Sequence, residues 1–219
     1  MTGRLIAIGD IHGHVLALQG LLGLFGPEPD DVIITLGDVV NRGPDSRGVI
    51  ETLLKLQERC QLIPLLGNHE EMMIDIRHDK YAADRWRSHG GTETLLSYGT
   101  NLAVDNIPET HWQFLESFRS YHETDEYIFT HANFIWHTTM NQQPAALLRW
   151  TSLEDTEPRP HISGKTVILG HTPGPIRNRR HYRCIDTGCG FGGRLTAMNI
   201  LTGRCWQVNE SGIRQDSAK

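Results

Sequence analysis

The sequence lacks features that would place it in several large classes of protein. No apolar run approaches the roughly 18 residues of a membrane-spanning helix, and the start, MTGRLIAIGD, has none of the three regions of a secretory signal. Basic residues are not in excess, because the 219 residues carry a formal net charge of −5. This balance argues against a general nucleic-acid coat or an anionic membrane surface as partner. We therefore expect a cytoplasmic protein with no membrane partner.

Cysteine is also scarce, and its spacing is not that of a metal site. The four residues form no CxxC pair, and a chain without a secretory signal usually keeps its thiols reduced. We expect them to act as small, buried hydrophobic side chains. They are Cys60, Cys184, Cys189 and Cys205.

Short apolar runs that end in Gly-polar turns recur in the first third of the chain. Residues 4–10, 31–38 and 62–69 read RLIAIGD, DVIITLGD and LIPLLGNH. Their apolar residues run on without alternation, which predicts strands buried on both faces. Residues 15–24 and 49–56 carry apolar residues at helical intervals. The resulting βαβαβ pattern predicts an α/β fold with a parallel sheet and right-handed connections.

The middle of the chain is polar and helical, and strands return after it. We predict an inserted helical cap over about residues 71–123, within a single domain over residues 1–219, a length that suits one globular core. The later strands are predicted at residues 127–131, 166–171, 182–186, 195–201 and 205–208.

Residues of the types that ligate metals directly follow five of the predicted strands. One histidine after a strand is usually structural, but five such strand ends are too many for coincidence. The carboxyl ends of parallel strands meet along one edge of a sheet, where ligands collect, so these side chains should converge. They are Asp10, His12, Asp38, Asn68, His69, His131 and His171.

Oxygen and imidazole donors without thiolate suit transition metals better than Ca²⁺ or Mg²⁺. We predict two divalent ions, with Mn²⁺ favoured and Fe or Zn as alternatives. Two metals about 3.5–4 Å apart need one anionic ligand that reaches both, and Asp38 is the candidate. A bridging water whose pKa is lowered by two cations would then be the nucleophile.

The same region offers partners for a phosphoryl group and for a leaving group. Arg42 lies four residues after Asp38 and could grip two phosphate oxygens with its planar fork. Arg149, in LLRW, is a weaker second candidate. His69 adjoins Asn68 and could give a proton to the leaving alkoxide.

Five motifs together resemble the signature set of the phosphoprotein phosphatase family of metallophosphoesterases. They are GDIHG at 9–13, GDVVNRG at 37–43, GNHE at 67–70, HAN at 131–133 and GHT at 170–172. WRSHGGTETLLSYG at 86–99 and IDTGCGFGGRLTAMNI at 185–200 look most like the bacterial and phage-type members. The resemblance implies an α/β (α+β) fold, a two-sheet β-sandwich flanked by helices, in which the later strands form a second sheet.

The resemblance also implies a role for each motif residue. One metal would be held by Asp10, His12 and Asp38. The other would be held by Asp38, Asn68, His131 and His171. His69 would be the general acid, while Arg42 and Arg149 would bind phosphate.

Asn41 departs from the family pattern. The usual second motif is GDxVDRG, whose Asp before the Arg pairs with the general-acid histidine, and Asn41 stands at that place. A neutral amide orients an imidazole without the Coulombic help that favours its charged form. The sequence NRGP resembles the diadenosine tetraphosphate hydrolase branch, whereas that branch commonly has GNHD where this chain has GNHE.

The leading hypothesis is a serine/threonine-type phosphoprotein phosphatase that hydrolyses phosphomonoesters of proteins or small molecules. The alternative within the same chemistry is a dinucleoside polyphosphate hydrolase, the only nucleotide substrate expected. Its leaving group, a nucleotide phosphate, needs little help from an acid, so Asn41 favours it. From a different class, an inactive phospho-ligand binding module would have lost a ligand, and none is missing.

Overall fold

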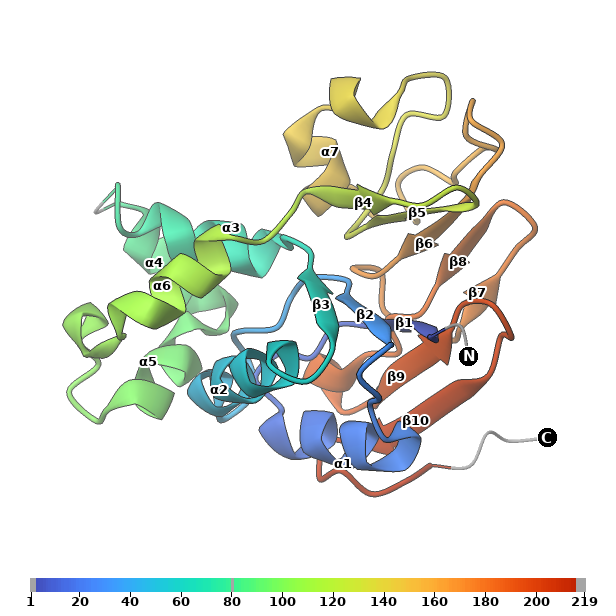
Figure 1. Ribbon diagram of the computed structural model, residues 1–219. Coiled ribbons are helices and arrows are strands. Elements are labelled where there is room, and N and C mark those ends of the chain that lie inside the picture. Colours follow the sequence, from blue (N-terminus) through green and yellow to red (C-terminus); the bar gives the residue numbers. More distant parts are fainter. Residues whose placement is uncertain (1–2, 80, 216–219) are drawn as a thin grey trace.

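The computed structural model describes residues 3–79 and 81–215, and two five-stranded sheets form its centre (Figure 1). The first sheet has the order β10-β9-β1-β2-β3. Its middle strands β1, β2 and β3 run parallel, whereas β9 runs antiparallel to both β1 and β10. The strands are β1 (Leu5–Ile8), β2 (Val32–Thr35), β3 (Gln61–Pro64), β9 (Arg194–Asn199) and β10 (Cys205–Asn209).

The second sheet has the order β4-β5-β6-β8-β7. Strands β5, β6 and β8 are parallel, and an antiparallel strand closes each edge. The strands are β4 (Tyr121–Glu123), β5 (Tyr127–Thr130), β6 (Thr166–Leu169), β7 (Arg177–Asn178) and β8 (Tyr182–Cys184). The mixed α/β fold with two sheets agrees with the fold class expected from the sequence.

Two of the later strands do not join the second sheet, as the resemblance had implied, but extend the first. In β9, Met198 pairs with Ala7 of β1, and β10 pairs in turn with β9. The physical reason is that β9 buries apolar side chains on both of its faces. Leu195 and Ala197 share one core cluster with Ile6, whereas Met198 lies in the cluster between the sheets.

Strands of both sheets are buried on two faces, as their unbroken apolar runs predict. In β1, Ile6 and Ile8 point to the helices, while Ala7 points to the other sheet. In β6, Ile168 joins Ala7 in the cluster between the sheets, and Val167 lies in the cluster on the opposite face. Successive side chains of a strand point to opposite faces, so β1 and β6 each contribute to two of the three core layers.

Helices cover the outer faces of this sandwich (Figure 1). The helices α1 (Val15–Phe25) and α2 (Ser46–Gln57) lie against the first sheet, and α7 (Ala145–Trp150) lies beside the second. The α2 helix starts where the Asp45 side chain accepts a hydrogen bond from the Gly48 N–H at 2.7 Å. Both crossovers predicted from the sequence are confirmed.

A group of short helices separates β3 from β4 and lies to one side of the first sheet (Figure 1). This segment overlaps residues 71–123, for which the sequence predicts a cap, and its first helix begins at residue 68. We refer to residues 68–116 as the cap. Its elements are α3 (Asn68–Asp75), α4 (Ala82–Trp86), the π-helical turn η1 (Arg87–Gly91), α5 (Thr92–Tyr98), the 3-10 turn η2 (Val104–Asn106) and α6 (Glu109–Glu116).

Two further 3-10 turns complete the secondary structure, η3 (Met140–Gln142) and η4 (Cys189–Phe191). Within residues 3–79 and 81–215, no helix has the length and apolar character needed to cross a membrane. All four cysteines are free thiols. Three are buried as expected, and Cys205 is half-buried.

Candidate metal centre

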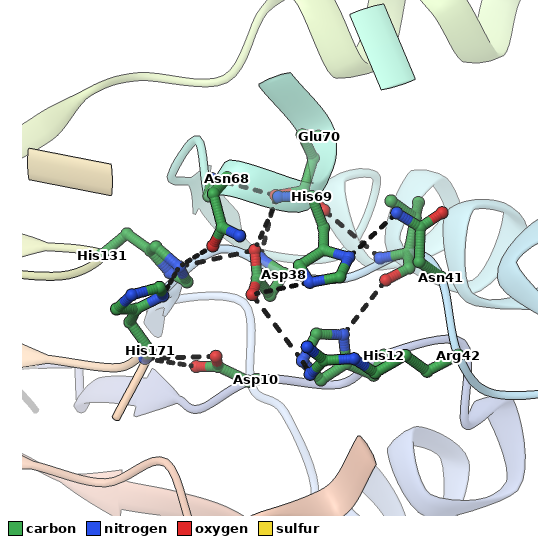
Figure 2. A network of polar contacts seen from close by, with 12 residues as sticks. Asp10, His12, Asp38, Asn41, Arg42, Asn68, His69, Glu70, His131 and His171 are labelled. Atoms are coloured by element: carbon green, nitrogen blue, oxygen red, sulfur yellow. Dashed lines mark hydrogen bonds and ion pairs between the residues drawn. The ribbon is translucent and has the colours of Figure 1, made fainter. Parts of the chain in front are cut away.

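The residues predicted to bind metals lie in loops just beyond the strands. Strand β1 ends at Ile8 and β2 ends at Thr35, so Asp10 and Asp38 follow each strand by two or three residues. His131 directly follows β5, and His171 follows β6 by two residues. Figure 2 shows these side chains gathered from both sheets around Asp38. The convergence expected from the sequence is therefore present.

The backbone of these loops is strained. Among the described residues, six that are not glycine have positive φ, and five of them belong to the predicted site. Backbone conformations of this kind cost about 1–3 kcal/mol each and collect at functional sites. The five are His12 (φ 48°), Asp38 (φ 51°), Asn41 (φ 70°), Arg42 (φ 69°) and His171 (φ 64°).

Glycine permits the close approach of the loops. Gly37 has φ 99°, and a Cβ atom there would lie 2.7 Å from His131 Nδ1. A Cβ atom on Gly67 would lie 2.2 Å from Asp38 Oδ1. Both distances are shorter than any real contact, so the Gly of each motif is required by packing around Asp38 and His131.

Unprotonated donor atoms converge on one side of Asp38. His131 Nδ1 lies 2.7 Å from the Leu36 carbonyl oxygen, which can only accept, so Nδ1 carries the proton and Nε2 has a lone pair. His171 Nε2 donates in the same way to the Trp150 carbonyl oxygen at 3.2 Å, which leaves its Nδ1 unprotonated. The His131 Nε2 atom lies 3.1 Å from His171 Nδ1 and 3.4 Å from Asp38 Oδ1.

Asn68 completes this first group of donor atoms. Its Oδ1 lies 3.0 Å from His131 Nε2, and neither atom has a hydrogen to share. Ligands bound at about 2.0–2.2 Å to one cation lie about 3.0–3.5 Å apart. The distances of Asn68, His171 and Asp38 from His131 Nε2 therefore lie in the range expected for ligands of one metal ion.

The other oxygen of Asp38 faces ring nitrogens of two further histidines, His12 and His69. Asp38 Oδ2 lies 3.7 Å from His12 Nε2 and 3.9 Å from His69 Nε2. His12 Nδ1 contacts the Val40 carbonyl oxygen at 3.2 Å, so its Nε2 is unprotonated. Because each oxygen of Asp38 faces a different group, the structure has the arrangement that a bridging carboxylate requires (Figure 2).

Burial sets the protonation of the histidines. It lowers the pKa of His131 to about 4 and that of His171 to about 3, and it lowers the pKa of His12 well below its usual range. All three are therefore neutral near pH 7, the form in which imidazole binds metals.

Several buried carboxyl groups lie close together at this site, and there are fewer cationic side chains than carboxyl groups. Burial raises the pKa of Asp38 to about 7 and that of Asp186 to about 6. Burial, followed by the charges of Asp186 and Asp38, raises the pKa of Asp10 well above its usual range. Asp10 lies against the His171 backbone N–H, at 3.1 and 3.2 Å from its two oxygens. Cations bound here would offset this repulsion, so the donor set fits a dinuclear centre.

Asn41 determines which ring nitrogen of His69 carries the proton. The Asn41 Oδ1 atom accepts from Trp86 Nε1 at 3.0 Å and from Thr94 Oγ1 at 2.8 Å, so its Nδ2 must face His69. Nδ2 donates to His69 Nδ1 at 2.9 Å. The proton of the neutral His69 ring therefore resides on Nε2, on the side of Asp38 (Figure 2). With Nε2 protonated, His69 is a hydrogen-bond donor to the site and not a metal ligand.

The two predicted phosphate-binding arginines differ in their surroundings. Arg42 donates to His12 Nε2 at 2.8 Å and stacks on the exposed ring of Phe191, 4.2 Å from its centroid. Arg149 is buried and directs its fork at Glu71, with Nε at 2.9 Å from that carboxylate. Arg42 thus lies at the metal centre, whereas Arg149 is paired with a carboxylate.

Sequence reasoning assigned no role to Glu70, the last residue of GNHE. It is fully buried, and its two oxygens accept four backbone N–H groups at 2.8–3.2 Å. These bonds tie the loop after β2 to the start of α3. The donors are Asp38, Val39, Val40 and Gly67. The sequence shows a carboxylate in this motif, but it does not show which backbone N–H groups the carboxylate contacts.

Comparisons with known proteins agree with this chemistry. Residues 3–190 match the family described as calcineurin-like phosphoesterase. The chain is 30% identical over 211 residues to a serine/threonine-protein phosphatase 1 of Salmonella typhimurium, covering 88% of this chain and 90% of that protein. It is also 31% identical over 140 residues to a symmetrical bis(5'-nucleosyl)-tetraphosphatase of Nitrosomonas europaea, covering 62% of this chain and 47% of that protein.

A solved structure has the same fold. The crystal structure of a putative diadenosine tetraphosphatase superposes with a TM-score of 0.72 at 22% sequence identity, covering 95% of this chain and 94% of that one. This likeness supports the two-sheet architecture described above.

Proposed function

The chain belongs to the calcineurin-like phosphoesterase family, and from this premise we propose that it is a serine/threonine-type phosphoprotein phosphatase that hydrolyses phosphomonoesters at a dinuclear metal centre. The observation that carries the proposal is the convergence of unprotonated donor atoms on both oxygens of Asp38. The similarity to the Salmonella typhimurium phosphatase over nearly the whole chain supports the same substrate class.

The metal ligands follow from the donor atoms. His12 and Asp38 would hold one ion, to which the family resemblance adds Asp10, and Asp38 would bind the other ion together with Asn68, His131 and His171. When bound, two such ions would lower the pKa of water and offset the charge of a phosphoryl group. Oxygen and imidazole donors favour Mn²⁺, with Fe and Zn as alternatives. The identity of the metal and the cytoplasmic location stay predictions.

Arg42 is the residue we assign to the phosphoryl oxygens. Its guanidinium donates to the lone pair of His12 Nε2 that a metal ion would take, so metal binding would free this donor for substrate. The Phe191 ring holds the guanidinium plane from one side. Arg149 could reach substrate only by sharing its fork with Glu71, and its phosphate role stays a prediction.

A second substrate class, dinucleoside polyphosphates, is favoured by the hydrogen bond from Asn41 to His69. A neutral His69 that holds its proton on Nε2 can stabilise a leaving oxygen by a hydrogen bond. Full proton transfer from it would create an imidazolate, which is unfavourable at neutral pH. A nucleotide phosphate needs no proton in order to leave, whereas a serine alkoxide does.

Two measurements test the proposal. Elemental analysis of protein reconstituted with Mn²⁺ should find about two ions per chain, and one or none would reject the dinuclear centre. Initial rates on a phosphoserine peptide and on diadenosine tetraphosphate, measured side by side, should favour the peptide. A clear preference for the dinucleotide would transfer the assignment to the second class.

A further inference from the structure

Phe191 is an exposed aromatic residue beside the metal centre. It lies in the η4 turn, within residues 185–200, a segment to which the proposed function gives no role beyond the contact with Arg42. Phe191 is 62% exposed, and it belongs to none of the three hydrophobic clusters of the described residues. The centroid of its ring lies 6.3 Å from that of His12, and the two planes meet at 79°. Packing of the core therefore does not explain why a phenyl ring stands at this place.

The backbone of η4 holds Phe191 against the site. The Gly192 N–H donates to Glu210 Oε1 at 3.0 Å, which ties the end of the turn to the chain after β10. A Cβ atom on Gly190 would lie 2.5 Å from His12 Cδ2, so the turn approaches the His12 ring this closely because residue 190 has no side chain. Neither contact involves the side chain of Phe191. The ring can therefore be replaced without loss of the contacts that position the turn.

The ring of Phe191 also contacts Arg42, the residue assigned to the phosphoryl oxygens. The guanidinium carbon lies 4.2 Å from the ring centroid, within the range of a cation–π interaction. In the part of the chain that the structure describes, Arg42 forms no ion pair with a carboxylate. A metal ion would take the lone pair of His12 Nε2, to which Arg42 now donates at 2.8 Å. The contact with Phe191 does not depend on that lone pair and would persist in the loaded enzyme.

A substrate held by Arg42 brings its ester group close to this ring. A phosphate oxygen accepts from a guanidinium N–H at about 2.7–2.9 Å, and the ester oxygen belongs to the same phosphate group. Aromatic rings in contact have centroids about 4.5–7 Å apart. Because the guanidinium is only 4.2 Å from the centroid of Phe191, an aromatic group one or two bonds beyond the ester oxygen is within reach of the ring. A small alkyl group in the same position offers little surface for such a contact.

We propose that Phe191 is a specificity-determining residue that contacts an aromatic group attached close to the phosphate of the substrate. The proposal rests on the phosphoesterase function proposed above. One side of the ring holds the Arg42 guanidinium, and the exposed remainder of the ring packs on the aromatic group. This contact is the same in the ground state and in the transition state, so it lowers KM and leaves kcat nearly unchanged.

Benzyl phosphate and ethyl phosphate test this contact in the enzyme reconstituted with Mn²⁺. Both are esters of primary alcohols, so their leaving groups need a proton to a similar degree and they differ chiefly in the phenyl group. Phe191→Ala should raise KM for both about 2–5-fold, because Arg42 loses its cation–π contact. It should raise KM for benzyl phosphate by about a further tenfold, the range of a lost aromatic contact. Phe191→Tyr retains the ring and should retain the preference for benzyl phosphate.

A control variant and a binding measurement make the test specific. Leu201→Ala is the matched control, since Leu201 is 56% exposed and follows β9 at the end where Asn199 pairs with Ile6, away from Asp10. It should leave KM for both esters unchanged. Calorimetric titration with benzylphosphonate and ethylphosphonate, which have no ester bond to hydrolyse, measures the same contact without turnover. Phe191→Ala should weaken binding of benzylphosphonate about tenfold more than binding of ethylphosphonate.

Two sources of the aromatic group can be distinguished in the same way. One is an aromatic side chain beside a phosphorylated residue, and the other is the base of a nucleotide. If the group is a side chain, Phe191→Ala should lower kcat/KM more for a phosphoserine peptide with Phe beside the phosphoserine than for the same peptide with Ala there. If it is a base, the larger loss should be on diadenosine tetraphosphate. A loss on neither the Phe peptide nor the dinucleotide would overturn the proposal.

The outcomes separate this proposal from the proposed function. Equal effects of Phe191→Ala on the benzyl and the ethyl compounds, or no effect on either, would overturn the substrate contact while leaving the phosphoesterase intact. A loss of kcat on both esters with KM unchanged would also contradict it, because a specificity contact acts on binding. A wild-type enzyme that holds metal and cleaves neither ester would instead reject the proposed function. The phosphonate titration would then still decide whether Phe191 binds the aromatic group.

Discussion

Replacement of Asn41 by Asp should change how the enzyme discriminates between leaving groups. In the native protein, Asn41 Oδ1 accepts from Trp86 and Thr94 while Nδ2 donates to His69 Nδ1. The introduced carboxylate would keep the two accepted bonds through one oxygen. Its second oxygen would face His69 Nδ1, which must then carry a proton. The Asn41→Asp variant thus exchanges a neutral His69 for one that can be an imidazolium.

The size of the effect follows from the geometry. The new carboxylate oxygen would lie where Asn41 Nδ2 is, 2.9 Å from His69 Nδ1. An opposite charge at such a distance raises an imidazole pKa by about 1–3 units, which increases the imidazolium fraction about 10–1000-fold. This acts against burial, the main cause that lowers the pKa of His69 in the native protein. We expect the ratio of kcat/KM for alkyl phosphate to that for p-nitrophenyl phosphate to rise at least about tenfold.

The assay is the initial rate of release of inorganic phosphate from both esters by the metal-reconstituted variant. The pH profile on the alkyl ester should gain a basic limb that reports the new pair of carboxylate and His69 imidazole. The melting temperature and the metal content show whether the buried site has accepted the charge. Equal changes of kcat/KM on both esters would refute the reasoning, because a donor that matters should act on the poor leaving group alone.

Further predictions concern the metal centre. Asp38→Ala should abolish hydrolysis of p-nitrophenyl phosphate, since Asp38 faces both groups of donors, and near-normal turnover would reject its bridging role. Glu70→Gln should lower the free energy of unfolding by about 3–6 kcal/mol, because the amide N–H₂ group would face two of the four backbone N–H donors. Urea unfolding measures this change, and a loss under about 1 kcal/mol would contradict the expectation. Above about pH 6.5, where histidines are neutral in the folded and the unfolded state, the metal-free protein should lose stability as pH rises, because burial raises the pKa of Asp38 from 3.8 to about 7 and the stabilising protonated form is lost there. Mn²⁺ needs the ionised carboxylate, so the rise in melting temperature that it causes should increase from about pH 5 to about 7.5, and a constant rise would argue against this linkage.

Much of the fold and the inventory of the site could be predicted from the sequence because both depend on local patterns. Unbroken apolar runs predicted strands such as Leu5–Ile8, and the Gly-polar turn after each run placed Asp10 or Asp38 at a strand end. Parallel connectivity then implied convergence. The predicted strands end later in the chain than the observed ones. The reason is that the loops that carry the metal ligands begin before the first polar residue of each motif.

The membership of β9 and β10 in the first sheet could not be predicted in this way. Their apolar residues suit either sheet, and the choice depends on pairing between residues far apart in sequence, such as Ala7 with Met198. The same holds for Glu70, whose role is defined by the backbone donors it reaches in another loop.

Sequence alone determined which chemical groups surround the site, and the tertiary structure decided where their protons are. Asn41 in the motif could have faced His69 with its oxygen or its nitrogen. Trp86 and Thr94, 45 and 53 residues away, occupy the oxygen and settle the question. In the same way, Gly90 packs on the backbone of Arg42, 48 residues earlier in the chain. Hydrogen-bond donors and acceptors act over about 3 Å, so only the packing of distant segments can assign them.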